Sequence, residues 1–332
     1  VMAEACKDAG IKYISFLYDS PYVLLYSFTL MYPTNYVFLF DSSWVEELRS
    51  GGLKNVYYMN LPCVADKIDQ MDMLVNAGRI KRDESRTRAD VSFVGSLYNE
   101  AHNLYERMEE KLTPYLKGYL EGLMEAQLRV SGFSLTEKLM TPEIIASLQE
   151  VFPVSSEPSC AEPPGYRYAN YFIDRKITQL ERIRSLEAIG SRLGDKYDVR
   201  LFTIDGSYEI PGIKNMGVAE YHTEMPYVFR DSRINLNISL RSIKCGIPLR
   251  CMDILGCGGF LMTNFQSDFL IDFIPGEDFV YYEDTEDMLG KIEYYLSHES
   301  ERAEVAAAGA AKAREYFSLK AVFMRIFEIA GM

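Results

Sequence analysis

The sequence predicts an α/β protein built from two successive parallel sheets, each covered by helices. Near-continuous apolar segments alternate with helical segments, and the alternation recurs in two halves separated by a charged stretch. At 332 residues the chain is too long for one ordinary hydrophobic core. We therefore expect two Rossmann-like domains.

Two of the three strands expected in the first half end in an Asp-Ser pair, at Asp19 and at Asp41. Ligands of parallel sheets bind at the carboxyl ends of the strands, where both pairs fall. Asp41 can equally cap the next helix. Asp19 suits that role less, because Pro21 delays the helix. The three expected strands span residues 11–21, 36–44 and 54–62.

A charged stretch at 77–90 lacks apolar periodicity and predicts the linker between the domains. We expect an N-terminal domain at 1–87, a second domain at 88–316 and a terminal helix at 317–332. The chain opens in what resembles the middle of a helix, so we expect the N-terminal domain to be incomplete.

The second half begins with a strand at 89–98 that contains Gly95 and Ser96 at its end. A helical insertion is expected at about 98–166, followed by a long helix that ends at Gly194. Further strands are expected at 198–204, 213–220, 234–239, 260–263 and 279–284. Further helices are expected near 252–255, 286–296, 299–314 and 318–330.

The composition excludes several classes of partner and site. A net charge of −13 repels nucleic acid and anionic membranes from the general surface. The longest apolar run near the start, at 22–32, is too short to span a bilayer. The six cysteines form no Cys-x-x-Cys pair and the three histidines do not cluster. We expect a cytoplasmic protein with reduced thiols and no metal site.

The segment 246–259 combines a glycine, two charged residues and a turn almost bare of side chains. The N-terminus of a helix favours phosphate; Gly246 lets the backbone approach a ligand closely, and Arg250 lies just ahead of the expected helix. With Arg241, Gly95 and Ser96, they predict a site for a diphosphate.

Asp253 lies in the helix that follows, where a carboxylate suits the hydroxyls of a ribose. The Gly-rich turn at 256–259 then lets that helix lie close to the sheet. The alternative is a glycine-capped helix in which Arg250 and Asp253 form a surface ion pair.

Residues 246–264 and the helices downstream resemble bacterial glycosyltransferases of the spore-maturation-protein type, which have the GT-B fold. The earlier segment 12–62 resembles the N-terminal domain that accompanies them, and 89–98 resembles the strand that opens their donor domain. The resemblance implies a donor domain for a nucleotide-diphosphate sugar, an acceptor domain and a cleft between the two.

The resemblance also assigns roles to single residues. Retaining GT-B enzymes carry Glu-x7-Glu, whose second acid holds the ribose, and Asp253 takes that position. Cys245 takes the first position, which is a departure. The helix at 319–330 resembles the one that crosses back onto the N-terminal domain, although its apolar face (Val322, Ile326 and Ile329) can equally pack on its own domain.

Several polar residues near the strand ends complete the predicted donor site. Tyr221 or His222 can stack on the base, although a helix cap at Thr223 is the alternative. The remaining candidates at the carboxyl edge are Asn237, Ser239 and Asn264.

A general base is needed if the acceptor hydroxyl attacks directly, and Asp19 is the candidate in the acceptor domain. His102 is the second candidate, with a solvated position at a helix start as its alternative.

These observations predict a metal-independent glycosyltransferase that moves a sugar from an NDP-sugar, UDP first, to a polysaccharide, protein or small acceptor. Two other functions stay open: a nucleotide-sugar isomerase and a non-catalytic nucleotide-sugar-binding scaffold. The sequence leaves the oligomeric state open.

Overall fold

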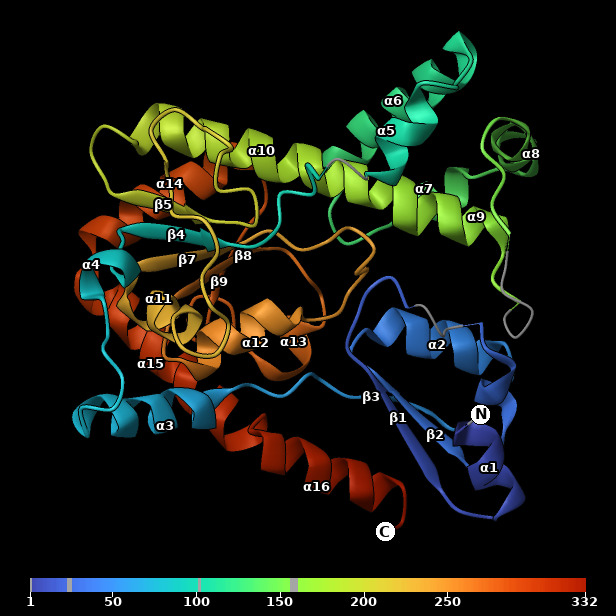
Figure 1. Ribbon diagram of the computed structural model, residues 1–332, viewed down its shortest axis with the longest axis horizontal. Coiled ribbons are helices and arrows are strands. Elements are labelled where there is room, and N and C mark those ends of the chain that lie inside the picture. The colour runs from blue at the N-terminus through green and yellow to red at the C-terminus, as the bar shows by residue number, and fades with distance from the viewer. Residues whose placement is uncertain (1, 23–25, 101–102, 156–160) are drawn as a thin grey trace.

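The computed structural model describes residues 2–22, 26–100, 103–155 and 161–332, and their strands form two separate parallel sheets (Figure 1). The first sheet has the order β1-β2-β3 and contains β1 (Tyr13–Leu17), β2 (Asn35–Leu39) and β3 (Val56–Tyr58). The second sheet has the order β6-β5-β4-β7-β8-β9 and contains β4 (Val91–Val94), β5 (Val199–Phe202), β6 (Lys214–Asn215), β7 (Ile234–Asn237), β8 (Leu261–Asn264) and β9 (Val280–Tyr282). Two parallel sheets confirm the predicted α/β class.

The strand order of the second sheet determines where along its edge a crevice for a ligand opens. The chain builds outward from β4 to β6 and then returns to continue from β7 on the other side of β4. The loops after β4 and β7 therefore leave in opposite directions and open a crevice at their carboxyl ends. The strand expected at 213–220 is much shorter, because only Lys214–Asn215 pairs with β5.

Helices cover both faces of the second sheet. On one face lie α10 (Asp174–Leu193) and α14 (Thr285–Ser297), and on the other α11 (Met225–Asp231) and α12 (Leu249–Gly256), as Figure 1 shows. The neighbouring helices are α13 (Phe269–Asp272) and α15 (Glu299–Tyr316). The first sheet carries α1 (Met2–Asp8), α2 (Ser42–Ser50) and the 3₁₀ helix η1 (Phe28–Met31).

The helical insertion has a core of its own, which is separate from the two sheets. It contains α5 (Leu104–Glu109), α6 (Pro114–Leu128), α7 (Leu135–Leu139), α8 (Pro142–Val151) and α9 (Pro164–Arg167), and the π-helix η2 (Tyr168–Ile173) continues it into α10. Thr113 and Thr141 cap α6 and α8, each followed by proline at the first helical position. The insertion projects beyond the end of α10 nearest the first sheet (Figure 1).

The region between the domains contains helices, whereas the sequence predicts a linker without apolar periodicity there. Helices α3 (Ala65–Asn76) and α4 (Glu84–Thr87) both pack against α11 of the second domain. Asp72 of α3 accepts hydrogen bonds from Arg230 at 2.7 and 3.1 Å. The boundary at 87/88 stays a prediction.

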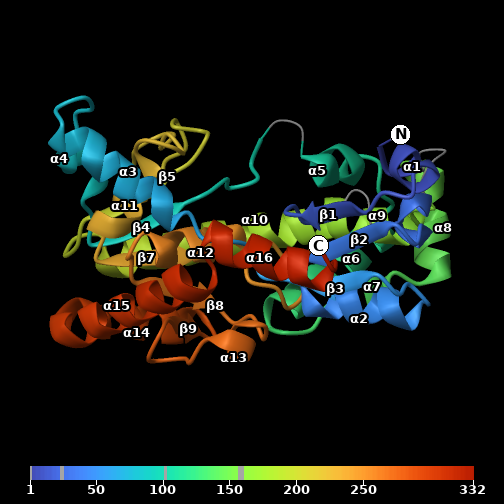
Figure 2. The ribbon, with the colours of Figure 1, turned by 90° about the horizontal axis from the view of Figure 1, so that it is seen from below.

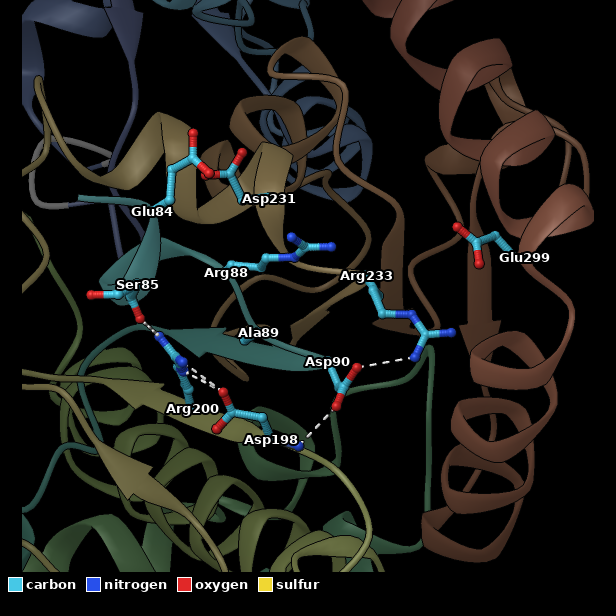
Figure 3. Close-up of a pocket in the computed structure, with 10 residues that line it drawn as sticks. All are labelled: Glu84, Ser85, Arg88, Ala89, Asp90, Asp198, Arg200, Asp231, Arg233 and Glu299. Carbon is cyan, nitrogen blue, oxygen red and sulfur yellow. Dashed lines mark hydrogen bonds and ion pairs between the residues drawn. The ribbon is translucent and has the colours of Figure 1, made fainter. Parts of the chain in front are cut away.

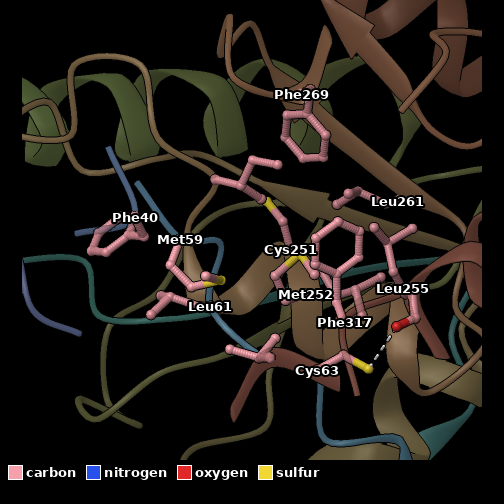
Figure 4. Close-up of a cluster of buried hydrophobic side chains, with 14 of the residues drawn as sticks. Phe40, Met59, Leu61, Cys63, Cys251, Met252, Leu255, Leu261, Phe269 and Phe317 are labelled. Carbon is pink, nitrogen blue, oxygen red and sulfur yellow. Dashed lines mark hydrogen bonds between the residues drawn. The ribbon is translucent and has the colours of Figure 1, made fainter. Parts of the chain in front are cut away.

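The two sheets share one hydrophobic core. Figure 4 shows Phe40, Met59 and Leu61 of the first domain packed among Leu255 and Phe269 of the second. The last helix, α16 (Leu319–Ile329), extends from the second domain to the first sheet (Figures 1 and 2).

Contacts from both domains fix α16 in place. Val322 and Ile326 are fully buried, whereas Ile329 is 39% exposed and lies outside the expected apolar face. Lys12 donates a hydrogen bond to the carbonyl oxygen of Ala330, so the end of α16 is held by the first domain. In the described part of the chain, no helix is long and apolar enough to cross a membrane.

Candidate functional site

One hollow lies at the amino ends of the strands, at the edge opposite to the crevice (Figure 3). It measures about 750 Å³ and is lined by charged side chains. Its charges pair internally: Arg200 contacts Asp198 at 2.6 Å and Arg233 contacts Asp90 at 3.0 Å. The first pair lies at the start of β5, and the second joins the starts of the neighbouring strands β4 and β7, so we assign this hollow a structural role.

The candidate site is a cleft of about 310 Å³ where the two domains meet at the carboxyl edge of the second sheet. It is lined by Tyr18, Asp19, Ser20, Phe40, Phe93, Val94, Gly95, Ser96, Tyr98, Arg182, Asn237, Ser239, Leu240, Ile243, Pro248, Leu249 and Arg250. The structure thus brings seven residues from the two domains to the lining of this cleft, where a polar ligand can reach them. Six of them were predicted, namely Asp19, Gly95, Ser96, Asn237, Ser239 and Arg250, and Arg182 was not.

An apolar recess of about 180 Å³ continues the cleft and shares Val94, Gly95, Ser96 and Arg250 with it. Its other walls are Phe202, Thr203, Ile204, Val218, Ala219 and Met225. Ile204 and Val218 are 69% and 60% exposed, which is unusual for side chains that flank a recess. A flat apolar group can therefore insert between them and remove both from water.

Two arginines in the cleft lack an acidic partner. The Arg182 guanidinium donates to the carbonyl oxygens of Ser96 and Ile238, and that of Arg250 lies 5.5 Å from the Phe229 ring centroid. Among the described residues, neither arginine forms an ion pair with a carboxylate. Burial lowers the pKa of both groups. Two desolvated cations in one cleft make it strongly attractive to an anion.

The N-terminus of α12 adds to this positive field. Pro248 precedes the helix and supplies no side-chain cap, while Leu249 and Arg250 of the first turn line the cleft. The free N–H groups of that turn favour a negatively charged ligand. The helix begins at Leu249, earlier than the expected start near residue 252, so Arg250 is its second residue and does not precede it.

Asp253 lies one turn deeper in α12 and is only 2% exposed. Its Oδ2 lies 3.4 Å from the Tyr221 hydroxyl, and its Oδ1 has no hydrogen-bond partner. The ammonium group of Lys67 lies 4.4 Å from the Tyr221 ring centroid. Because Asp253 is buried, Arg250 is only partly exposed and no ion pair joins them, the alternative of a surface pair is wrong.

Burial raises the pKa of Asp253 to about 6, although the positive charges of Arg250 and Lys67 act in the opposite direction. A carboxylate with an unpaired oxygen in this position costs the free protein stability. Such a group is suited to accept hydrogen bonds from a ligand.

Gly246 serves a protein contact and not a ligand contact, which corrects the predicted role. A Cβ atom at this position would lie 2.5 Å from the carbonyl oxygen of Phe40. Next to it, Asp41 caps α2 through Ser43 and accepts hydrogen bonds from the N–H groups of Lys244 and Cys245 at 2.7 and 3.1 Å. The cap expected for Asp41 is therefore confirmed, and the same side chain joins the domains.

Two of the predicted residues lie beside the cleft and do not line it. Arg241 forms an ion pair with Glu181, with its Nε and Nη2 atoms 2.7 and 2.8 Å from the two carboxylate oxygens. Asn264 accepts a hydrogen bond from the N–H group of Ser239 at 2.9 Å. Asn237 donates to the Ser239 hydroxyl at 3.1 Å, so Asn264 and Asn237 together fix the loop after β7.

The other predicted residues fall in three different places. Tyr221 is half-buried over Asp253, and His222 is exposed outside the cleft. The alternative of a cap at Thr223 is wrong, because α11 begins at Met225 with Glu224 as its N-cap residue and no side-chain cap. In the turn before it, Glu220 accepts hydrogen bonds from the N–H groups of His222 and Thr223. His102 lies outside the described residues.

The sequence contained a signal for Arg182 that the prediction missed. Arg182 lies four residues before Leu186 and seven before Ile189, and both are fully buried. It therefore occupies the buried face of α10, where an unpaired arginine is unusual. The apolar recess had no such signal, because its walls come from three separate segments.

A metal centre has little support in the cleft. Asp19 is the one carboxylate among the cleft-lining residues, and across the described chain no three His, Cys, Asp or Glu side chains gather into a possible metal site. The five described cysteines, Cys6, Cys63, Cys245, Cys251 and Cys257, are free thiols.

Comparison with known proteins identifies the kind of domain that carries this cleft. Residues 176–328 match a family model described as glycosyl transferase-like. HepE from Anabaena in complex with UDP-glucose is similar over 99% of this chain and 75% of its own, with a TM-score of 0.50 and 10% identity. HepE in complex with UDP and glucose gives a TM-score of 0.50 and 11% identity over 99% and 74%.

A UDP-forming α,α-trehalose-phosphate synthase from Burkholderia xenovorans gives a TM-score of 0.49 and 15% identity over 99% of this chain and 70% of its own. No curated protein matches the sequence. The chain has the GT-B fold, and its residues 176–328 are similar to glycosyl transferase-like domains.

Proposed function

We propose that this protein transfers a sugar from an NDP-sugar, UDP-sugar first, to a carbohydrate, protein or small acceptor, without a metal ion. The observation that carries the proposal is the pair of buried guanidiniums, Arg182 and Arg250, which share the cleft without an acidic partner. A diphosphate supplies the negative charge that they lack.

The rest of the donor fits the surroundings of this pair. The main chain at Gly95 and the first turn of α12 face the diphosphate region, and the apolar recess beside them suits a planar base. Asp253 is the group for the ribose, once Tyr221 moves aside to admit the hydroxyls. The HepE complexes with UDP-glucose and with UDP and glucose support uridine as the base.

Transfer requires an acceptor oxygen to attack the anomeric carbon while the bond from that carbon to the diphosphate breaks. Asp19, from the first domain, is the cleft carboxylate that can take the proton of the acceptor hydroxyl. The departing diphosphate gains negative charge, which Arg182 and Arg250 stabilise as preorganised cations. In other folds a metal ion performs that role.

The finer family assignment rests on sequence resemblance. We place the chain with the spore-maturation-protein type because of residues 246–264 and the downstream helices, and we assign it to the cytoplasm because of its free, reduced thiols.

Replacing Arg182 with Met tests the proposal. We expect the affinity for UDP, measured by calorimetry, to fall about tenfold or more, which is the effect of losing a charge-assisted hydrogen bond. Arg184→Met is the matched control, because Arg184 lies on the same helix but pairs with Glu125 outside the cleft. Since Arg182 also holds two carbonyl groups, Arg250→Met is a second variant with the same expectation.

Unchanged UDP affinity in both cleft variants would contradict the proposal. Release of UDP from UDP-glucose, measured with and without added acceptors, separates transfer from the other two functions. Binding with no release favours a scaffold, and an altered nucleotide sugar without an acceptor indicates an isomerase.

A further inference from the structure

Tyr98 has an unusual backbone at the mouth of the cleft. Its φ of 55° makes it the only non-glycine residue with positive φ in the described chain, and bulky residues seldom adopt this conformation. The Ser96 hydroxyl accepts a hydrogen bond from its N–H group at 2.9 Å, and the Asn103 amide donates to its carbonyl oxygen at 2.9 Å. The loop after β4 thus holds the Tyr98 ring in a fixed place on the cleft wall.

Two arginines of α10 lie beside this ring. The guanidinium carbon of Arg182 is 5.0 Å from the ring centroid, and that of Arg175 is 5.9 Å from it. Arg175 is half-buried, and within the described structure it has no ion pair or hydrogen bond. Its Nε atom is inaccessible to solvent and has no hydrogen-bond partner. A cation in this state lacks the partner that usually accompanies it.

The position of Arg175 separates it from the diphosphate region. It lies seven residues before Arg182, on the same face of α10 and about 10 Å along the helix axis. The N-terminal end of α10 points toward the insertion and the first domain (Figure 1). Arg175 therefore lies on the acceptor side of Arg182.

Arg175 is a cation to which the proposed function gives no role. Asp19 is the one acidic residue that lines the cleft, against Arg182 and Arg250. On the proposed function, on which this inference rests, those two arginines bind the diphosphate. Arg175 does not itself line the cleft but contacts its wall through the Tyr98 ring, so it remains as a third cation on this side of the cleft.

We infer that Arg175 and Tyr98 form a subsite for an anionic group, a phosphate or a carboxylate, on the acceptor sugar. The ring supports the guanidinium from one direction, so that its N–H groups can meet an anion at the cleft. The protein would then select acidic over neutral acceptors.

The experiment titrates UDP-saturated protein with glucose, glucose 6-phosphate and glucuronate, using calorimetry. Saturating UDP keeps the probes out of the diphosphate site. We expect at least one acidic sugar to bind about tenfold more tightly than glucose. Glucose 6-phosphate and glucuronate distinguish a phosphate from a carboxylate as the preferred group.

Arg175→Gln should abolish this preference and leave the Kd for UDP within about twofold. Arg184→Gln removes the same charge from the exterior of α10 and should keep the preference. No preference in the wild type, a preference that survives Arg175→Gln, or a loss of UDP affinity in that variant overturns the subsite. Failure of the wild-type protein to bind UDP overturns the proposed function instead.

Discussion

Asp253 is a buried carboxyl group whose ionisation is costly in the free protein. It is 2% exposed and has one oxygen without a partner, and its pKa is raised from 3.8 to about 6. A group with a higher pKa in the folded state stabilises the fold at low pH, and that stability is lost as the pH rises through the folded pKa. The free protein therefore bears the cost of an ionised Asp253 at neutral pH.

Asp253→Asn should stabilise the ligand-free protein at pH 8 by about 1–3 kcal/mol, because the neutral amide avoids the cost of a buried charge. The gain should be smaller at pH 5, where the folded wild type is already mostly protonated. Thermal unfolding of both proteins at the two pH values measures it. The same variant should bind UDP more weakly.

A stability gain that is equal at both pH values would show that ionisation of Asp253 is not its source. Unaltered UDP affinity would remove Asp253 from the ribose assignment while leaving the stability argument in place.

The loop between β7 and α12 has two roles at the scale of elements. One side of it, at Ser239 and Ile243, lines the cleft, and the other side is bound to the start of α2. Gly246 permits the contact, because any side chain would collide with the carbonyl oxygen of Phe40. The cleft and the first domain are therefore built against the same short segment.

Gly246→Ala should lower the free energy of unfolding by about 1–3 kcal/mol, because an added methyl group forces the loop away from α2. It should also weaken UDP binding, since the displaced loop lines the cleft. Thermal unfolding and calorimetry measure the two effects. Gly290→Ala in α14 is the control, because a Cβ atom there meets no atom within 4 Å.

The control variant should be neutral or stabilised by up to about 1 kcal/mol, the helix preference of alanine over glycine. If Gly246→Ala matched it, the close approach of the two backbones would not matter for stability.

The Gly-rich turn after α12 has a similar explanation. A Cβ atom on Gly256 would lie 2.8 Å from that of Cys63, and one on Gly259 would lie 2.5 Å from the carbonyl oxygen of Phe229. Gly258 has a φ of +83°, which side chains disfavour. The turn is bare because Cys63, from the chain between the domains, and Phe229 approach two of its glycines, while the third glycine has a left-handed backbone.

At the scale of the whole molecule, the two sheets behave as parts of one cooperative unit. A single hydrophobic cluster contains Val37 and Phe38 of the first sheet and Leu255 and Phe273 of the second domain. Further links are the cap by Asp41 and the contact of Lys12 with the end of α16.

We expect one unfolding transition, because neither part can lose its structure without exposing the apolar core of the other. Trp44, the only tryptophan, is buried in the first domain and reports on it by fluorescence. Far-UV circular dichroism is dominated by the many helices of the rest of the chain. The two melting curves should coincide, and two separate midpoints would refute the shared core.

Much of the fold and part of the site could be predicted from the sequence alone. Apolar periodicity located the strands of both sheets and the helical insertion, because burial imposes a period that neighbouring residues display. The strand-end residues Asp19, Gly95 and Asn237 were found in the same way, since the carboxyl edge of a parallel sheet is a local property of each strand.

Only the tertiary structure decided which of these residues share the cleft. Arg241 and Arg182 are the same residue type in the sequence, but Glu181 forms an ion pair with the first, whereas within the described ranges no carboxylate does so with the second. Gly246 reads as a ligand contact until the backbone of Phe40 is seen against it. Such outcomes depend on distances between segments far apart in the chain, and local periodicity carries no information about those distances.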